Sequence, residues 1–250
     1  MNLLIFAADE LQGSLLELSG RRARHLRKVL RVELGDKVRV GMVNAGVGSG
    51  RVVSLDQGRV GLEVELAELP RPQFELELIL ALPRPIMLQR IIKQATVLGV
   101  RRFHLIRSRR VEKSFFQSPV LEPDRLHGLL LEGMEQGMDT WLPQVIIHPR
   151  FKPFAEDVLP TLEGQGIIAH PGGDHSLASL ELPWKETMPR ILLAVGPEGG
   201  WNDFEVELFT AQGFSSFTMG QRILHVDTAV VALLSQLQLL YELEGALEKR

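Results

Sequence analysis

The sequence has 250 residues, of which 45% are hydrophobic and 24% are charged, and this composition is ordinary for a globular protein with a real core. Cysteine is absent, which excludes disulfides, thiolate metal sites and cysteine nucleophiles and favours a reducing cytosol. No apolar run approaches the roughly 18 residues that span a bilayer, and the N-terminus lacks the features of a signal peptide, so no membrane partner is expected.

The net charge of −3 hides two basic clusters. Between Arg84 and Lys113 there are nine Lys and Arg residues against the single acid Glu112. The other cluster contains no acid and consists of Arg21, Arg22, Arg24, Arg27, Lys28 and Arg31. Basic clusters on a mildly acidic protein indicate local contact with a polyanion, and a pair of solvated helix faces fits the charge pattern equally well.

The first 70 residues predict a small β-barrel module. Ser19 is placed to cap a helix over residues 21–30. Short alternating stretches separated by glycine-rich turns then predict strands over residues 37–43, 50–55 and 60–66. The Leu-Pro-Arg-Pro segment at residues 69–72 indicates a stiff linker and a domain boundary, because proline fixes its own φ and restricts the residue before it.

Beyond the linker the pattern changes to alternating strands and helices. We predict strands over residues 74–82, 103–106, 144–148, 166–170, 191–195 and 215–219. We predict helices over residues 86–98, 121–138, 203–212 and 227–243. This alternation is typical of an α/β fold with a mainly parallel sheet.

The strongest local motif follows the apolar strand at residues 191–195. Residues 196–200 read Gly-Pro-Glu-Gly-Gly, and Asn202 with Glu205 three positions later predicts a helix capping box. Glycines at the carboxyl end of a buried strand let the backbone approach a ligand closely. A tight strand-to-helix turn also needs glycines, but it does not require the carboxylate of Glu198, so a ligand site is favoured.

A second glycine-bearing segment, residues 219–229, also follows a predicted strand and leads into a helix. Two such loops at neighbouring strand ends can close around one ligand. Taken alone, the segment is weak evidence, because its Arg222 and His225 also fit ordinary surface residues.

Together the two loops resemble the cofactor-binding motifs of the knotted SPOUT methyltransferases, in particular the 16S ribosomal RNA uridine-N3 methyltransferase family. That family carries a GPEGG loop, matched at residues 196–200, and a segment similar to LGPRILRxETA, matched at residues 219–229. The resemblance extends over most of the chain: an HxxxVLR-and-GD signature at residues 25–36, a QKATELGV helix end at residues 94–100, and an EQ pair at residues 135–136 followed by Pro143.

Four features depart from the family pattern. His225 and Asp227 stand where the family usually has Arg and Glu, and Gln221 stands where Pro is common. Residues 83–88, Pro-Arg-Pro-Ile-Met-Leu, replace the more usual Lys-Gly-Asp start of their helix. These departures put the geometry around the methyl group, or the identity of the substrate, in question.

The resemblance implies a PUA-like RNA-binding β-barrel over residues 1–70 and a trefoil-knotted SPOUT methyltransferase domain over residues 73–250. It implies S-adenosyl-L-methionine as cofactor and methylation of N3 of a specific uridine in the 16S ribosomal RNA of the small ribosomal subunit. It also implies a cytoplasmic homodimer. The sequence adds a hint of its own, because the segment 229–241 is apolar on almost every side and must be buried by a partner subunit or by its own sheet.

The resemblance assigns the cofactor to the two loops, the start of the last helix and one further strand end: Ala169, His170, Val195, Gly196, Pro197, Glu198, Gly199, Gly200, Met219, Gly220, Ile223, Leu224, Thr228 and Ala229. Arg222 is the candidate for stabilising the enolate that develops on uracil. Glu198 and Asp227 are candidates for accepting the proton or for holding Arg222. His225 is a further candidate base, since its ordinary pKa lies near neutrality.

Phosphate contacts are expected from both basic clusters, at Arg21, Arg22, Arg24, Arg27, Lys28, Arg31, Arg107, Arg109, Arg110 and Lys113. Trp201 is expected to stack on a base, to cover the cofactor pocket or to cap its helix. The other histidines lack metal-ligand spacing, so no metal site is expected. Two alternatives stay open: a catalytically silent RNA-binding member of the same fold, and an α/β enzyme that acts on a small molecule.

Overall fold

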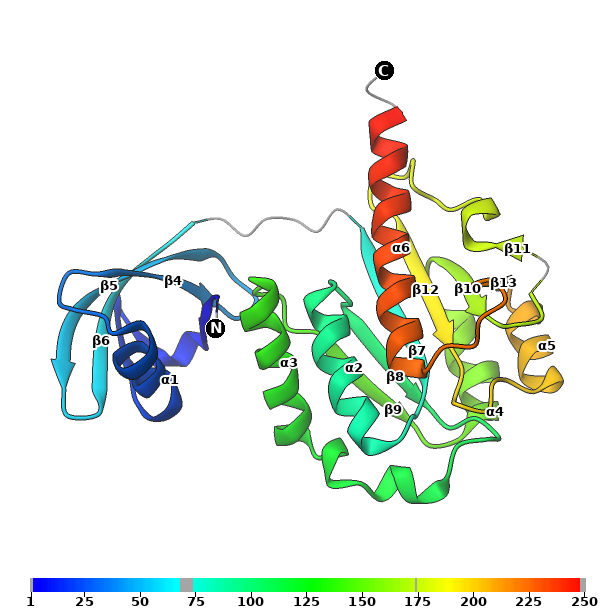
Figure 1. Cartoon of the computed structure of the whole chain (residues 1–250), viewed down its shortest axis with the longest axis horizontal. Helices are drawn as coiled ribbons and strands as arrows, with labels where there is room; N and C mark the ends of the chain where they lie inside the picture. The colour runs from blue at the N-terminus through cyan, green and yellow to red at the C-terminus, as the bar shows by residue number, and fades with distance from the viewer. Residues whose placement is uncertain (1, 68–73, 174, 248–250) are drawn as a thin grey trace. The chain divides into compact units, whose positions relative to one another are not determined.

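The computed structural model describes residues 2–67, 74–173 and 175–247 (Figure 1). Two compact units divide the chain, the first made of Met1–Arg71 with Leu131–Leu142 and the second of Pro72–Leu130 with Pro143–Arg250. The linker predicted at residues 69–72 lies outside the described residues, and so does the boundary placed there.

The first unit is built on a six-stranded sheet in the order β1-β4-β5-β6-β3-β2, in which β1 pairs with β4 in parallel and the other pairs are antiparallel. Its strands are β1 (Leu4–Phe6), β2 (Leu11–Gln12), β3 (Leu15–Leu18), β4 (Lys37–Met42), β5 (Val47–Asp56) and β6 (Arg59–Leu66). The last three correspond to the predicted strands, and the first three were not predicted. Within the described residues β1 and β2 are free edges, so the expected barrel is an open sheet there.

The helix predicted over residues 21–30 changes its winding midway. It consists of α1 (Gly20–His25) and the wider turn η2 (Leu26–Leu30), which ends at Arg31 in the left-handed region, with φ of 54°. Ser19 occupies the predicted N-cap position, but its side chain makes no capping hydrogen bond. Ala23 and Leu26 of this helix pack into the core between the strands.

The carboxyl half of α3 (Pro123–Gly137) belongs to the first unit. Met134 packs with Leu3 and Ile5 in a second small core. The hydroxyl of Thr140 donates a hydrogen bond of 2.5 Å to the carbonyl oxygen of Ala45. Residues 131–142 therefore complete the packing of this unit, although they are distant from it in the sequence.

The second unit is built on a seven-stranded sheet in the order β11-β13-β10-β12-β7-β8-β9, in which every pair is parallel. The strands are β7 (Glu75–Ala81), β8 (Arg102–Ile106), β9 (Gln144–His148), β10 (Gln165–Ala169), β11 (His175–Ser176), β12 (Arg190–Val195) and β13 (Ser215–Thr218). The central strands β7 and β12 are buried after their first residue. Accordingly β12 is apolar from Ile191 to Val195, whereas β7 carries one buried acid, Glu77, among apolar residues. The predicted α/β fold with a parallel sheet is confirmed.

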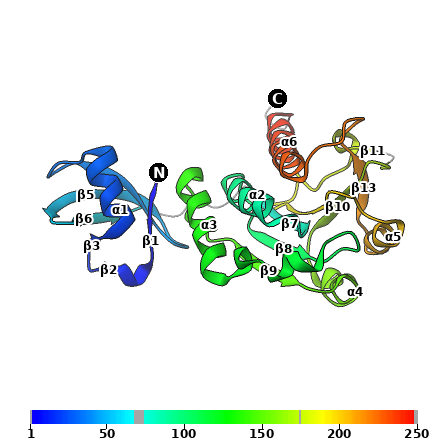
Figure 2. The ribbon, with the colours of Figure 1, turned by 60° about the horizontal axis from the view of Figure 1, so that its bottom comes forward.

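Helices cover both faces of this sheet. Figure 2 shows α2 (Pro85–Val97) and α6 (Val226–Leu247) side by side on one face, with α4 (Phe151–Pro153) and α5 (Asp203–Ala211) on the other. Short helical turns complete the chain: η1 (Ala8–Glu10), η3 (Lys113–Gln117), η4 (Pro119–Leu121), η5 (Phe154–Val158), η6 (Leu159–Thr161) and η7 (Leu177–Ser179). The layers are helix, sheet and helix, as the alternation predicts.

Helix α6 is more apolar than its neighbours. By length and composition alone, Val226–Gly245 is sufficient to cross a membrane, so the expectation that no stretch approaches that length was wrong. Val230, Leu233 and Leu237 are buried within the unit. However, only 28% of the Val226–Gly245 window is buried, and Leu239 and Leu243 are 53% and 52% exposed.

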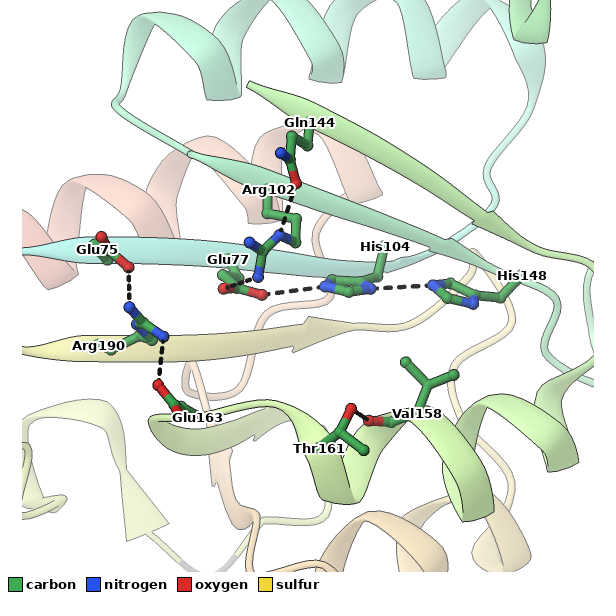
Figure 3. A network of polar contacts seen from close by, with 10 residues as sticks. All are labelled: Glu75, Glu77, Arg102, His104, Gln144, His148, Val158, Thr161, Glu163 and Arg190. Carbon is green, nitrogen blue, oxygen red and sulfur yellow. Dashed lines mark hydrogen bonds and ion pairs between the residues drawn. The ribbon is translucent and has the colours of Figure 1, made fainter. Parts of the chain in front are cut away.

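A buried polar network crosses β7, β8 and β9 beneath η5 (Figure 3). Nε2 of His104 lies 3.1 Å from a carboxylate oxygen of Glu77, and Nδ1 of the same ring lies 3.0 Å from Nε2 of His148. Arg102 donates a hydrogen bond of 2.7 Å to the other oxygen of Glu77. The charge of the buried carboxylate is therefore satisfied within the sheet.

This arrangement lowers the pKa values of two of its residues. Burial, together with the neighbouring His104, lowers the pKa of His148 to about 4. Burial raises the pKa of Glu77, but the hydrogen bond to His104 and the charge of Arg102 outweigh it, so the pKa of Glu77 lies below its ordinary value. His148 is therefore neutral in the folded protein at pH 7.

We predict that His148→Gln makes stability less sensitive to mild acid. The pKa of His148 rises to about 6.5 on unfolding, so the unfolded chain takes up the proton first, and folding stability falls as the pH drops from about 6.5 to 4. Because the ring is only half buried, we expect this loss to be about 1 kcal/mol between pH 7 and pH 5, and glutamine removes it. Urea unfolding at both pH values measures the difference. His127→Gln, at an exposed histidine, is the control, and an equal loss in both variants would contradict the assignment.

Candidate functional site

A cavity of about 430 Å³ opens where β10, β12 and β13 end. Because these strands are parallel, the segments that follow them meet at one edge of the sheet, the usual position of ligand sites in α/β folds. Its lining comprises Ala169, His170, Pro171, Val195, Gly196, Pro197, Glu198, Gly199, Gly200, Trp201, Thr218, Met219, Gly220, Gln221, Arg222, Ile223, Leu224, Val226 and Ala229.

The first wall is the loop that leaves β12, residues 196–200. Gly200 has a φ of +74°, which L side chains rarely adopt. The loop is fixed at its far end by the predicted capping box of α5: the side chain of Asn202 accepts from the Glu205 amide at 2.8 Å, and the Glu205 carboxylate accepts from the Asn202 amide at 3.1 Å. The capping box is therefore confirmed.

Trp201 forms the base of this wall. Its side chain is 3% exposed, and its ring packs edge-on against Phe209 with centroids 5.3 Å apart. A Cβ atom on Gly196 would lie 3.2 Å from the indole, so the glycine allows the tryptophan to pack directly beneath the backbone. Of the three roles expected for Trp201, covering the pocket agrees with its burial. The buried indole ring leaves no free face to stack on a nucleobase.

The second wall is the loop that leaves β13. The Thr218 hydroxyl bonds both the amide and the carbonyl of Gly220, each at 3.3 Å, and Gly220 has a φ of +95°. Beyond this turn the chain runs through Arg222 and Ile223, both exposed, to the start of α6. This loop therefore offers backbone groups and exposed apolar side chains to whatever enters the cavity.

Two buried nitrogen atoms in the cavity lining have no hydrogen-bond partner among the described residues. They are Nε1 of Trp201 and Nδ1 of His170. Buried polar atoms of proteins are normally paired, so unpaired atoms in a cavity wall indicate a ligand that carries polar groups. Mostly apolar surroundings with a few convergent polar atoms are typical of small-molecule sites.

The predicted cofactor positions converge on this cavity. Every one of them lines it except Thr228, which lies one residue before Ala229 on α6. Sequence reasoning omitted Pro171, Thr218, Gln221 and Val226, which are neighbours of predicted positions along the chain. Their only signal was adjacency to a strand end or a helix start.

The four candidate catalytic residues divide into two pairs. Arg222 and Glu198 line the cavity, whereas His225 and Asp227 do not. Asp227 forms an ion pair with Arg90 of α2 at 3.7 Å, and the amide of Arg84 lies 3.4 Å from the Glu198 carboxylate. In the described residues no hydrogen bond or ion pair joins Arg222 to Glu198 or Asp227, so neither carboxylate holds it in place.

The basic cluster of the first unit is only partly free. Arg22 binds the Glu10 carboxylate and the carbonyl of Ile5, and its hydrogen bond lowers the pKa of Glu10 against the effect of burial. Arg21 binds Glu135 at 3.2 Å. Arg24, Arg27 and Lys28 line a hollow of about 570 Å³ together with Gly20 and Gly58, and Arg31 is exposed. Of these, Arg27 also donates a hydrogen bond of 2.7 Å to the carbonyl oxygen of Asp56.

The basic loop of the second unit, residues 107–113, is also partly engaged. The amide of Arg109 donates a hydrogen bond of 2.6 Å to Glu205, and the guanidinium of Arg110 binds the carbonyl of Gly199. Arg107 is half-buried and Lys113 is exposed. In the part of the chain that the structure describes, there is no group of three or more His, Asp or Glu side chains that could hold a metal ion.

Comparison with known proteins identifies the family. The model of the RNA methyltransferase domain family matches residues 70–238. The ribosomal RNA small subunit methyltransferase E of Treponema pallidum is 29% identical over 93% of this chain and 88% of its own length. The protein of the same name from Synechocystis is 28% identical over 96% of this chain and 78% of its own length.

Solved structures have the same fold. The ribosomal RNA small subunit methyltransferase E of Neisseria gonorrhoeae, bound to S-adenosyl methionine, superposes with a TM-score of 0.76 at 21% identity, covering 95% of this chain and 98% of that one. A methyltransferase of Legionella pneumophila, in complex with the same cofactor, gives 0.77 at 21% identity, covering 95% and 96%. The matched sequence, the shared fold and the two glycine loops together place this chain in the RNA methyltransferase domain family.

Proposed function

We propose that this chain is an S-adenosyl-L-methionine-dependent methyltransferase that methylates N3 of one uridine in the 16S ribosomal RNA of the small ribosomal subunit. The observation that carries the proposal is the cavity of about 430 Å³ enclosed by two glycine-bearing loops in a chain of the RNA methyltransferase family. The names of its relatives support ribosomal RNA as the substrate. The resemblance of residues 196–200 and 219–229 to the uridine-N3 family supports N3 of uridine as the methylated atom.

The cavity fits S-adenosyl-L-methionine in size and in chemistry. Its volume lies in the range of small-molecule sites, roughly 300–1,000 Å³. The unpaired nitrogens of Trp201 and His170 can bind polar atoms of the cofactor, and Leu224 and Ile223 can cover its adenine ring. The backbone of Gly196 and Gly220 is open to close approach because no side chain intervenes.

When bound, S-adenosyl-L-methionine supplies an electrophilic methyl group, so the task of the chain is mainly to position the two reactants. The uracil N3–H is weakly acidic and is hidden in base pairs. The base must therefore be unpaired or flipped, and the N3 proton must be removed. Arg222 lines the cavity and is exposed, so its guanidinium can stabilise the negative charge that develops on O2 or O4 of uracil.

Glu198 is the better-placed of the two carboxylates for the proton, because it lines the cavity. Asp227 stands at the start of α6 in an ion pair with Arg90, an arrangement suited to fixing the helix start. His225 is exposed just before α6 and outside the cavity lining, so we propose it only as a base reached when substrate is bound.

For the rest of the molecule we propose a PUA-like RNA-binding domain over residues 1–70 and a trefoil-knotted methyltransferase domain over residues 73–250, in a cytoplasmic enzyme. Arg24, Arg27 and Lys28 supply RNA phosphate contacts in the first, since they share one basic hollow. The knot rests on the family resemblance. The exposed apolar surface of α6, which includes Leu239 and Leu243, supports a homodimer, because a helix apolar on almost every side is stabilised when a partner covers the part that its own unit leaves exposed.

The first test measures methyl transfer to the proposed substrate, the small ribosomal subunit. We expect purified protein, radiolabelled S-adenosyl-L-methionine and small ribosomal subunits lacking base methylation to yield label in N3-methyluridine at one site, identified by mass spectrometry. Large ribosomal subunits are the control substrate and should stay unlabelled. Transfer to another nucleoside would refute uridine as the methylated nucleoside. Cofactor binding without transfer would refute the proposed substrate, and failure to bind cofactor would favour a silent RNA-binding protein.

The second test concerns Arg222. We expect Arg222→Ala to lower kcat about 100-fold, as is typical when one donor to a developing oxyanion is removed. The Kd for cofactor, measured by calorimetry, should change little, and Arg222→Lys should recover part of the rate. Full turnover by Arg222→Ala would remove this residue from the mechanism.

The third test concerns the homodimer. Sedimentation velocity should give a dimer for the wild-type chain and a monomer for the double variant Leu239→Glu and Leu243→Glu, since a buried interface does not accept unpaired charges. Lys152→Glu, at an exposed position in α4, should leave the dimer intact. A monomeric wild-type chain, or a dimeric double variant, would contradict the proposed interface.

A further inference from the structure

The basic loop at residues 107–113 is attached to the glycine loop at residues 196–200 by one arginine. Nη1 of Arg110 donates to the carbonyl oxygen of Gly199 and lies 3.5 Å from the carbonyl oxygen of Trp201. The aliphatic part of the same side chain packs on the loop, because a Cβ atom at Gly199 would lie 3.0 Å from Cδ of Arg110. A side chain expected to contact RNA thus binds the wall of the cavity.

A second connection, through the buried carboxylate of Glu205, joins the basic loop to Asn202, just after the glycine loop. Glu205, at 1% exposure, uses one carboxylate oxygen to accept from the Arg109 amide at 2.6 Å and the other to accept from the Asn202 amide at 3.1 Å. A buried carboxylate is costly unless it is hydrogen-bonded, so both amides are held firmly. The residue before Arg110 and the residue after Trp201 are therefore tied to one buried group.

The two connections together restrict the backbone between them. Glu205 fixes the peptide at Asn202, and Arg110 binds the carbonyls of Gly199 and Trp201. Gly200 lies between these two carbonyls in the left-handed region, where glycine has little intrinsic preference and much conformational freedom to lose. The Gly200 amide donates a hydrogen bond of 2.8 Å to the carbonyl oxygen of Pro197, and Arg110 binds the carbonyl side of the same peptide. Without the guanidinium, the carbonyls of Gly199 and Trp201 would lose their common donor.

We propose that Arg110 is a positioning residue that holds the backbone of Gly199, Gly200 and Trp201 in the form that binds the cofactor, rather than a phosphate contact of the basic loop. The inference rests on the proposed function for the identity of the ligand. Arg110 acts through the loop, because it is not among the residues that line the cavity. Arg109 and Lys113 are exposed, and within the described residues neither side chain bonds to the glycine loop, so they serve as matched controls.

The experiment is calorimetric titration of S-adenosyl-L-methionine into the full chain and its variants, with no RNA present. Arg110→Ala should weaken the cofactor Kd about tenfold, the size expected for losing one charge-assisted hydrogen bond. Arg110→Lys, which retains a donor, should recover part of the affinity. Arg109→Ala and Lys113→Ala should keep the wild-type cofactor Kd while weakening RNA binding.

A second measurement reports on the loop itself. Hydrogen exchange of the cofactor-free protein should be faster over residues 199–203 in Arg110→Ala than in wild type, and unchanged in Arg109→Ala. In turnover assays, Arg110→Ala should raise KM for the cofactor and leave kcat at saturation near the wild-type value. Wild-type cofactor affinity and unchanged exchange in Arg110→Ala would overturn this inference alone, whereas a wild-type chain that binds no cofactor would overturn the proposed function.

Discussion

Parallel pairing of β12 with β10, and of β10 with β13, brings three strand ends to one edge of the second sheet. Ala169 lies opposite Val195 on one side and opposite Phe217 on the other, so the loops that follow begin at the same level. The pairing is maintained by burial, since β12 is buried from Ile191 to Val195. Segments distant in the sequence are thereby made neighbours around one cavity, and every later feature of the site depends on this.

Around that edge the cavity wall consists largely of backbone, and buried side chains beneath it keep that backbone in place. Trp201 packs under Gly196 and against Phe209, while Glu205 binds two amides from separate segments. Preorganisation of this kind reduces the entropy that must be lost when a ligand binds. Residues outside the cavity lining, such as Glu205, therefore help to hold the cavity wall in place.

Charge in this protein serves structure as well as recognition. Arg22, Arg102 and Arg110 bind groups of the protein itself, and of the three residues that line the common hollow, Arg24, Arg27 and Lys28, Arg27 also binds a backbone carbonyl. Glu77 and His104 are buried as a hydrogen-bonded pair, which keeps a charge inside the sheet at acceptable cost. A count of basic residues therefore overstates the surface available to a polyanion, because arginine with five donors is well suited to both tasks.

The sequence by itself determined the α/β alternation, the capping box at Asn202 and the two glycine loops, because periodicity, capping and left-handed glycine are local properties. It missed β1, which pairs only with the distant β4, and the short hairpin of β2 and β3, which is held in the sheet by the distant β6. It also assigned Ser19 a capping bond that the fold does not form. Only the tertiary structure decided that Asp227 pairs with Arg90, that Trp201 is buried, and that Arg110 binds Gly199. Each of these depends on the distance between segments that no local pattern encodes, since a side chain takes whichever partner the packed chain brings within its reach.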